Sequence, residues 1–325
     1  MSKTITNSID KAAALLVAGE VVAIPTETVY GLAGNLFNPS AVEKIYTLKN
    51  RPRNNPLIVH VKDLEATLPL ITEFPKPLQQ LAEKYWPGPL TVLLKKSKLV
   101  PDSITAGSDF VAIRVPAHPL TKQLLEQIPF PLVAPSANPF TRISPTKAEH
   151  VEHYFGDSIP CILDGGSCSV GLESTIIGMN NNTPLLYREG VLGKLLLESL
   201  IGPIEKFNSQ KNAILTPGQW PRHYAPLTKT ILCKREEIIL HVKDNTGIIV
   251  YKEPLLSVNT NQQHILSETG SLVEAAKNLY QILHHVDKQK YETIICEMLP
   301  QEELGNTINE RLKRASSSEI DNIPQ

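Results

Sequence analysis

Apolar positions along this chain recur with the period of a helix in some segments and fill short continuous runs in others. From Ile9 to Ala18 the apolar residues share one helical face, with Ser8 placed to cap the helix and Gly19 to end it. The apolar run Val21–Ile24 that follows predicts a buried strand. This change of period repeats along the chain and is typical of an α/β protein.

The second predicted helix carries a lysine on its apolar face. Pro39 suits the first turn of a helix, because the N–H that proline lacks would have no partner there. Val42, Ile45, Tyr46 and Lys49 then recur at the spacing of one helical face. An ammonium group directed into the protein needs an anionic partner or an open cavity. We therefore expect Lys49 to point inward.

The rest of the pattern divides the chain into two α/β domains, as expected for 325 residues. The first domain spans residues 1–202, a linker rich in Pro, Gly and polar residues spans 203–228, and a smaller domain spans 229–318. Further strands are predicted at 57–61, 90–95, 111–115, 132–135, 161–163, 174–177, 185–187, 247–251 and 293–298. Further helices are predicted at 78–86, 144–154, 192–200, 272–286 and 304–315.

Charge is unevenly distributed although the net value is only −1. Residues 1–150 hold 16 Lys and Arg against 12 Asp and Glu, whereas the remainder holds 16 against 21. A mildly basic first half is compatible with nucleotide or RNA phosphate. The surplus is too small to identify nucleic-acid binding by itself.

The spacing of the cysteines and the length of the apolar runs indicate the cellular compartment of the protein. Cys161, Cys168, Cys233 and Cys296 lack the spacing of zinc ligands or redox pairs, so we expect unpaired thiols in a reducing cytoplasm. No apolar run approaches the roughly 20 residues of a membrane span, and the N-terminal residues lack the pattern of a signal peptide. We expect a cytoplasmic protein without membrane contact.

Several common catalytic motifs are absent from the sequence. There is no GxxxxGK[ST] loop, no GxGxxG after a strand and no HExxH, and GLEST around Ser174 is not a nucleophile elbow. The sequence therefore does not predict a P-loop enzyme, a Rossmann dehydrogenase or a zincin.

Two cations, Lys49 and Arg51, stand between a strand-end loop with the sequence PTETVYG and the strand at 57–61. Loops at strand ends bind the ligands of open α/β sheets, and two fixed cations suit a polyphosphate. The alternative is a solvated helix C-terminus, where cations complement the helix dipole. The inward phase of Lys49 favours a phosphate site.

Other polar residues are candidates for the same site. Arg114 lies on the small-residue face of a predicted strand, where an arginine needs a ligand or a structural carboxylate. Ser136–Asn138 follows a strand, and Ser144 starts a helix whose N-terminus can bind an anion. Ordinary roles as turn, cap or surface residue stay open for these two motifs and for Ser174 and Arg188.

The linker contains the sequence TPGQWPRHYAP at residues 216–226. A segment that only spaced two domains would not need Trp220, Arg222, His223 and Tyr224 together. We therefore consider it a lid or a docking strip.

Taken in order, the chain carries PTETVYGL, KNRP, NNPLIVH, AIRVP, APSAN, SPT, DGGSCSVGLESTII, REG, PGQWPRHYAP and LGNTINERLKRAS. This series resembles the YrdC-type family in the long two-domain form of threonylcarbamoyl-AMP synthase. Each motif alone is weak, but the whole series at these spacings is highly specific. The resemblance implies an α/β fold, with a YrdC-like twisted mixed sheet, flanking helices and a smaller C-terminal Rossmann-like α/β domain. The stretch PFTRISPT lacks the glycine that the family leads us to expect there, and we expect disorder in the polar tail after Arg314.

The resemblance also implies a reaction. L-Threonine, bicarbonate or CO2, and ATP give L-threonylcarbamoyladenylate and pyrophosphate, and the activated group is later placed on adenosine 37 of tRNA. The threonine amine forms an N-carboxylate that attacks the α-phosphorus of ATP. Because the substrate supplies the nucleophile, the protein contributes positioning and charge neutralisation.

Site residues follow from the matched motifs. The resemblance implies catalytic contacts of Lys49 and Arg51 with the ATP phosphates. The nucleotide would contact Lys49, Arg51, Asn55, Phe110, Ser136, Asn138, Ser144, Arg188 and His223. Threonine would contact Thr28, His60, Arg114, Ala134 and Ser174, with Arg114 pairing its carboxylate. Mg2+ would accompany ATP without a dedicated protein metal site, and partners would be a downstream threonylcarbamoyl transferase and tRNA.

Two other functions stay open at this point. The first is a non-catalytic RNA-binding module of YrdC type, which the overall charge of −1 and the Arg114 and Ser174 motifs disfavour. The second is carbamoyl transfer from carbamoyl phosphate. Relatives with that activity usually carry zinc-finger domains, and the sequence has no CxxC pair.

Overall fold

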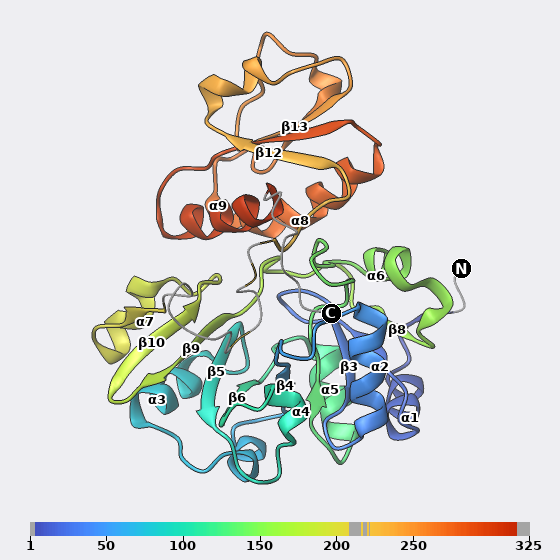
Figure 1. The fold of residues 1–325 in the computed structure, drawn as a ribbon, viewed down its shortest axis with the longest axis vertical. Helices are drawn as coiled ribbons and strands as arrows, with labels where there is room; N and C mark the ends of the chain where they lie inside the picture. Colours follow the sequence, from blue (N-terminus) through green and yellow to red (C-terminus); the bar gives the residue numbers. More distant parts are fainter. Residues whose placement is uncertain (1–3, 208–215, 217–219, 221, 317–325) are drawn as a thin grey trace.

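The computed structural model of the chain describes residues 4–207, 216, 220 and 222–316. They form a large α/β domain below a smaller one in Figure 1, each built around its own sheet. The expected division into two α/β units of mixed strands and helices is thus observed. The polar tail for which disorder was expected lies largely outside the described residues.

The large domain contains one mixed sheet of 11 strands. In spatial order these are β1 (Ile5–Thr6), β8 (Ile162–Leu163), β2 (Val22–Ile24), β3 (Gly31–Asn35), β7 (Leu132–Val133), β4 (Ile58–His60), β6 (Phe110–Arg114), β5 (Leu90–Lys95), β9 (Thr175–Asn180), β10 (Thr183–Arg188) and β11 (Glu205–Lys206). Parallel pairs such as β4–β6 stand beside antiparallel pairs such as β5–β6, so the sheet is mixed. The sequence pattern did not predict β1, β3 and β11.

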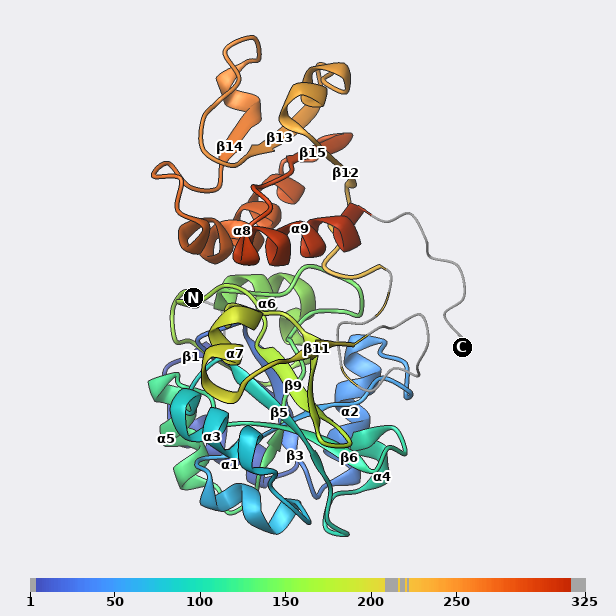
Figure 2. The ribbon, with the colours of Figure 1, turned by 90° about the vertical axis from the view of Figure 1, so that its left-hand side faces the viewer.

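Helices cover both faces of this sheet (Figures 1 and 2). They are α1 (Ile9–Val17), α2 (Pro39–Lys49), α3 (Lys76–Tyr85), α4 (Asp102–Thr105), α5 (Pro119–Gln127), α6 (Ala148–Phe155) and α7 (Lys194–Ile201), with 3-10 turns at η1 (Glu65–Leu70) and η2 (Gly156–Ser158). Along β2, Ala23 belongs to the apolar cluster of α2, α3 and α6, whereas Val22 and Ile24 belong to the cluster of α1 and α5. Alternate residues of a strand face opposite sides, so the sheet separates two apolar cores.

The starts of α1 and α2 follow the sequence signals, whereas the helix predicted to start at Ser144 begins only at Ala148, so Ser144 does not cap α6. The Ser8 hydroxyl accepts a hydrogen bond from the backbone N–H of Lys11 (3.2 Å), and Asn38 caps α2 in the same way. Lys49, in the last turn of α2, is 1% exposed, which confirms the inward phase predicted from its spacing.

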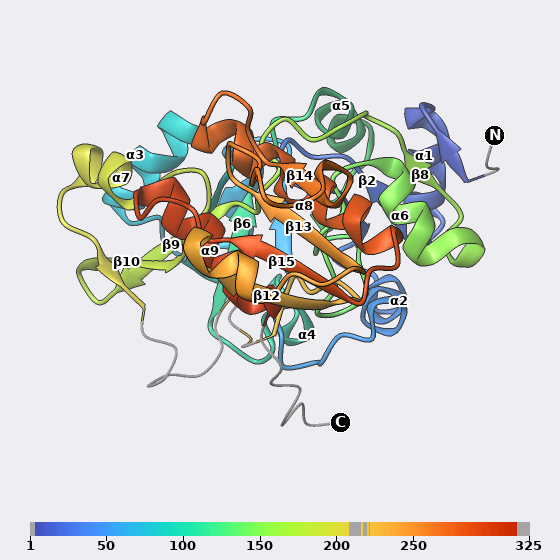
Figure 3. The same ribbon diagram turned by 90° about the horizontal axis from the view of Figure 1, so that it is seen from above.

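The smaller domain has a parallel sheet of four strands in the order β12 (Lys229–Cys233), β15 (Thr293–Glu297), β13 (Thr246–Val250) and β14 (Gln263–Ile265). Figure 3 looks down on this sheet. Helices α8 (Leu272–Lys288) and α9 (Glu303–Ser316) lie on its side that faces the large domain (Figures 1 and 2), and 3-10 turns occur at η3 (Arg235–Leu240) and η4 (Thr260–Gln262). The strands predicted at 247–251 and 293–298 and the helices predicted at 272–286 and 304–315 are confirmed, whereas β12 and β14 were not predicted.

The two domains share an apolar interface. Val29, Ile143 and Leu172 of the large domain belong to the same buried cluster as residues of α8 and α9. Gly171 lies beside Lys277 of α8 with φ +80°, and a Cβ there would come within 2.5 Å of the Lys277 carbonyl oxygen. The glycine therefore permits the loop before β9 to approach the α8 backbone.

None of the helices in the described ranges has the length and apolar character that a bilayer span requires. The four cysteines are buried, and none forms a disulfide.

Two histidines stack across the domain interface. The rings of His150 in α6 and His284 in α8 lie 3.9 Å apart at 24°, and both residues are nearly fully buried. Burial lowers the pKa of His150 to about 2, and the charge of His284 contributes. Burial also lowers the pKa of His284 to about 4, against the raising effect of its contact with the Ser144 carbonyl; Lys288 lowers it and Asp287 raises it. Both rings are therefore neutral at neutral pH.

We expect this pair to make the protein less stable in acid. Below the ordinary histidine pKa of 6.5 the unfolded chain takes up protons that the folded interface excludes. Stability therefore falls from about pH 6.5 down to about pH 4 for His284 and down to about pH 2 for His150. Denaturant unfolding at about pH 7 and about pH 5 measures the loss in the wild type and in His284→Gln. The variant should lose about 2 kcal/mol less than the wild type. An equal loss in both proteins would contradict this account of the interface.

Candidate functional site

A cavity lies where loops and strand ends of the large domain meet the last part of the linker. The space between its atoms, including the part that is open to solvent, is about 570 Å³. Its lining consists of Thr26, Thr28, Val29, Gly31, Arg51, Ile58, His60, Arg114, Ala134, Pro135, Ser136, Glu173, Ser174, Arg188, His223 and Tyr224. Residues from the first and last parts of the large domain and from the linker therefore meet at one point.

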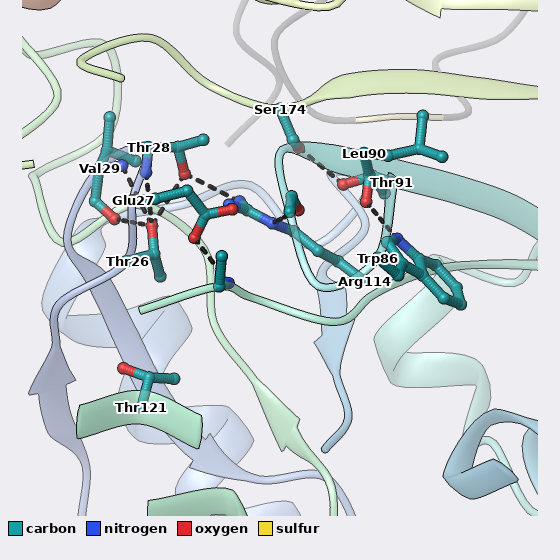
Figure 4. A network of polar contacts seen from close by, with 12 residues as sticks. Thr26, Glu27, Thr28, Val29, Trp86, Leu90, Thr91, Arg114, Thr121 and Ser174 are labelled. Carbon is teal, nitrogen blue, oxygen red and sulfur yellow. Dashed lines mark hydrogen bonds and ion pairs between the residues drawn. The ribbon is translucent and has the colours of Figure 1, made fainter. Parts of the chain in front are cut away.

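Arg114, at the end of β6, is the centre of a buried polar network (Figure 4). Its guanidinium group donates to Glu27 Oε1 (2.6 Å), to Thr28 Oγ1 (2.8 Å) and to the Gly88 carbonyl (3.1 Å). The second oxygen of Glu27 accepts from the Ala117 N–H (2.9 Å). Burial raises the pKa of the Glu27 carboxyl, but the Arg114 charge and hydrogen bonds outweigh it, so the pKa lies below its usual value. The Glu27 carboxyl is therefore ionised beside the Arg114 guanidinium.

The carboxylate beside Arg114 is thus Glu27, which the sequence analysis did not include among the site residues. Its position in PTETVYG was the available signal, but the pairing joins residues 87 positions apart. A threonine carboxylate bound to Arg114 as expected would therefore share the guanidinium group with the carboxylate of Glu27.

The PTETVYG loop holds its own shape. Thr26 Oγ1 donates to the Val29 carbonyl (2.6 Å) and accepts from the N–H groups of Thr28 and Val29 (3.2 Å each). The hydroxyls of Thr26 and Thr28 lie 2.8 Å apart. Figure 4 shows the Thr28 hydroxyl directed at Arg114, which fixes it at the cavity wall.

Ser174 connects three further elements of the wall. Its hydroxyl lies 2.6 Å from Thr91 Oγ1 of β5, as Figure 4 shows, and accepts from Arg188 Nη2 (3.1 Å). Arg188 Nε also donates to the Ser174 carbonyl (3.0 Å). A Cβ on Gly190 would lie 2.4 Å from the Glu173 carbonyl oxygen, so only glycine permits this close approach of the turn after β10.

Arg51 is a cation without a carboxylate partner in the described part of the chain. Its Nε and Nη2 donate to the carbonyls of Asn55 (3.1 Å) and Pro56 (2.7 Å) and to Asn55 Oδ1 (2.7 Å). Burial lowers the pKa of Arg51 to about 10, so it still carries its charge at neutral pH. A buried cation held by neutral oxygens at a cavity wall favours an anionic ligand.

Lys49 has a different environment from the one expected. Its ammonium group donates to the backbone carbonyls of Ser136 and Asn138, so its partners are neutral oxygens and not an anion. Burial, and then the charge of Arg51, hold the pKa of Lys49 well below its usual value. Lys49 is not among the residues that line the cavity, and the structure shows it holding the SAN loop behind the wall.

The histidines of the cavity are neutral. Burial, and then the charge of Arg114, lower the pKa of His60 to about 3. Burial and the surrounding cations Arg51 and Arg314 hold the pKa of His223 well below its usual value. His223 contacts Phe140 and Tyr224 edge-on, with ring centroids 6.3 Å and 4.0 Å away. Neither histidine adds positive charge to the cavity.

The described end of the linker is attached to the loop after the SAN motif. The Ala225 N–H donates to the Thr141 carbonyl (2.8 Å), and Trp220 meets Phe140 edge-on at 5.7 Å. Thr141 has φ +69°, the left-handed conformation in which a glycine is usual. The stretch PFTRISPT thus turns in a left-handed conformation at a residue other than glycine. The segments 217–219 and 221 of the proposed lid lie outside the described residues.

The expected site residues divide into two groups. Lining the cavity are Thr28, Arg51, His60, Arg114, Ala134, Ser136, Ser174, Arg188 and His223. Set outside its lining are Lys49, Asn55, Phe110, Asn138 and Ser144. Asn55 Nδ2 and Asn138 Oδ1 are buried and have no hydrogen-bond partner among the residues that the structure describes. Phe110 begins β6, four positions before Arg114, and is 37% exposed, so its expected nucleotide contact stays a prediction.

The similarity to known proteins extends over nearly the whole chain. Residues 14–190 match the Sua5/YciO/YrdC family model, described as "Telomere recombination", and residues 192–317 match "Threonylcarbamoyl-AMP synthase, C-terminal domain". The threonylcarbamoyl-AMP synthase of Pyrococcus abyssi is 37% identical, covering 95% of this chain and 94% of the relative. That of Bacillus subtilis is also 37% identical, covering 96% and 94%.

Solved structures agree with this match. The crystal structure of P. abyssi Sua5 complexed with L-threonine is similar, with a TM-score of 0.88 at 34% identity and 97% coverage of both chains. Escherichia coli YciO, at 24% identity and a TM-score of 0.52, covers 59% of this chain and 97% of its own length, and shares the fold of the large domain.

Breaking the buried ion pair at the centre of the cavity should destabilise the protein. Glu27→Gln leaves the Arg114 charge buried without a carboxylate, and we expect a loss of about 3 kcal/mol. Glu20→Gln is the matched control, because Glu20 pairs with Lys44 while both side chains are about 40% exposed. That control should lose less than about 1 kcal/mol. Chemical unfolding measures both, and equal losses would show that the Arg114–Glu27 pair has no special role.

Proposed function

The chain belongs to the family of two-domain threonylcarbamoyl-AMP synthases, and we propose that its cavity makes L-threonylcarbamoyladenylate. The substrates are L-threonine, bicarbonate or CO2, and ATP, and pyrophosphate is released. The observation that carries the proposal is the presence of nucleotide and threonine candidates in one cavity wall, within a chain that matches such synthases almost end to end.

The threonine half of the site is the Arg114 side of the cavity. Thr28, His60, Arg114 and Ser174 line it, and a relative with a TM-score of 0.88 was solved with L-threonine. The Arg114–Glu27 pair leaves little net charge, which suits a substrate that carries one positive and one negative group. Neutral His60 adds a polar contact without changing that charge.

The nucleotide half is the side of Arg51 and Arg188. Arg51 is buried and Arg188 is partly buried, and both line the cavity, where they would neutralise phosphate charge. Lys49, bound to the carbonyls of Ser136 and Asn138, would keep the SAN loop in place beside the phosphates. His223, from the linker, would cover the nucleotide.

The chemistry needs no protein nucleophile. The threonine amine and CO2 form a carbamate with loss of one proton, and a carbamate oxygen then attacks the α-phosphorus. A new phosphorus–oxygen bond replaces the bond to the departing pyrophosphate. The protein aligns the reacting atoms, and burial excludes the water in which a carbamate would lose CO2.

Mg2+ enters this scheme with ATP as a substrate ion. Glu27 and Glu173 contribute carboxylates near the cavity, but the oxygens of each already accept hydrogen bonds from protein groups. The described residues contain no group of three or more His, Cys, Asp or Glu arranged to hold a metal. A protein-held metal therefore does not fit these residues, and phosphate and water would coordinate the ion.

The product would serve a downstream transferase that modifies adenosine 37 of tRNA. We place this reaction in the cytoplasm, where four unpaired cysteines such as those of this chain persist as thiols.

Pyrophosphate release from ATP and Mg2+ tests the proposal. We expect release only when threonine and bicarbonate are both present, since the attacking carbamate needs both. Omission of each substrate in turn is the control. Pyrophosphate release at the same rate with and without threonine would point to a different nucleotide-dependent activity and would contradict the proposal.

Arg51→Gln should lower kcat/KM for ATP about 100-fold, because the phosphates lose a buried charge-assisted contact. Arg53→Gln is the control two residues away, where the side chain is 60% exposed and pairs with Glu43. Steady-state kinetics on both variants compare them. Similar activity of Arg51→Gln and Arg53→Gln would remove Arg51 from the nucleotide site.

A further inference from the structure

Arg311 of α9 contacts three segments of the cavity wall from the second domain. Its Nε donates to Glu173 Oε2 (3.3 Å), and its Nη2 donates to the Glu189 carbonyl (2.6 Å). Its guanidinium group also lies 5.2 Å from the ring centroid of Tyr224. Glu173 and Tyr224 line the cavity themselves, and Glu189 follows Arg188, which also lines it. One side chain that is 2% exposed thus joins three parts of the site.

Glu173, the partner of Arg311, also binds residues of α8 and of the large domain. Its Oε2 also accepts from the hydroxyl of Tyr280 in α8 (2.9 Å), and its Oε1 accepts from Ser144 Oγ (2.6 Å). The Tyr280 ring stacks on Tyr224, with centroids 5.6 Å apart. A single buried carboxylate therefore connects both helices of the second domain to Ser144, a residue expected at the nucleotide.

These contacts close into a ring. Arg311 holds Glu173 and the Glu189 carbonyl, while Arg188 donates to the Ser174 carbonyl (3.0 Å). Ser174 follows Glu173 in the chain, and Glu189 follows Arg188. The contacts made by Arg311 and by Arg188 therefore both hold the segment at 173–174 against the segment at 188–189. The ring crosses the domain interface, and the large domain alone lacks its Arg311 corner.

We propose that Arg311 and Tyr280 are positioning residues, through which the second domain sets the geometry of the active site. They act through Glu173 on Ser144 and Ser174, and through Glu189 on Arg188. This inference rests on the proposed function, since the positioned residues are those assigned to ATP and threonine. It gives the second domain a role in the chemical step in addition to packing.

Tyr280→Phe and Arg311→Lys test this ring of contacts. Tyr280→Phe removes one hydroxyl and keeps the aromatic side chain stacked on Tyr224. Arg311→Lys keeps the positive charge but loses the planar guanidinium group that donates in two directions. The controls are Tyr251→Phe, whose hydroxyl donates to the Gly270 carbonyl within the second domain, and Arg235→Lys, which pairs with Glu297.

We expect both ring variants to lower kcat/KM for ATP at least fivefold, with melting temperatures close to those of their controls. Activities equal to the controls, with only a fall in melting temperature, would show a purely structural role. Tyr280→Phe combined with Glu173→Gln should be no worse than Glu173→Gln alone, because both changes break one network. Losses that multiply would contradict the ring.

Amide hydrogen exchange separates this inference from the proposed function, because it needs no substrate. Tyr280→Phe and Arg311→Lys should raise exchange at residues 174–175 and 188–190, whereas Tyr251→Phe and Arg235→Lys should not. Unchanged exchange there would overturn the inference even if the wild type makes the adenylate. A wild type that releases no pyrophosphate would overturn the proposed function, and faster exchange in the ring variants would still support the ring.

Discussion

The buried pair of Arg114 and Glu27 fixes the point from which the rest of the cavity is placed. Arg114 stands at the end of β6 and holds the PTETVYG loop through Glu27 and Thr28, while Glu27 also binds the Ala117 N–H. A buried charge that loses its partner costs several kcal/mol, so the loop has one favourable position. The pair thus fixes Arg114 in the cavity lining, which also contains Arg51, a cation without a carboxylate partner among the described residues.

Short-range features of the fold could be predicted from the sequence. Asn38 and Pro39 set the start of α2, and helical periodicity places Lys49 inside the protein, as observed. The partners of Lys49 could not be predicted, because they are two backbone carbonyls 87 and 89 positions away. Strand β3 (Gly31–Asn35) was not predicted, since glycine and alanine give it a weak apolar signal and its pairing with β2 and β7 stabilises it.

In the candidate site, too, contacts between residues far apart in the sequence could not be predicted. Motif resemblance named Arg51, Arg114 and Arg188, which line one cavity, but it did not name Glu27 or Glu173. Both carboxylates are defined by tertiary partners: Glu27 by Arg114, and Glu173 by residues of the second domain. Local pattern carries no information on such pairings, whereas the pairings decide which cations stay available for a ligand.

The central claim is that one cavity joins threonine, inorganic carbon and ATP. The most direct measurement is mass spectrometry of the nucleotide product after incubation with threonine, ATP, Mg2+ and ¹³C-bicarbonate. The account predicts threonylcarbamoyladenylate that carries one heavy carbon, because the carbonyl group comes from bicarbonate. Adenylate without the label, or threonyl-AMP without a carbamoyl group, would contradict it.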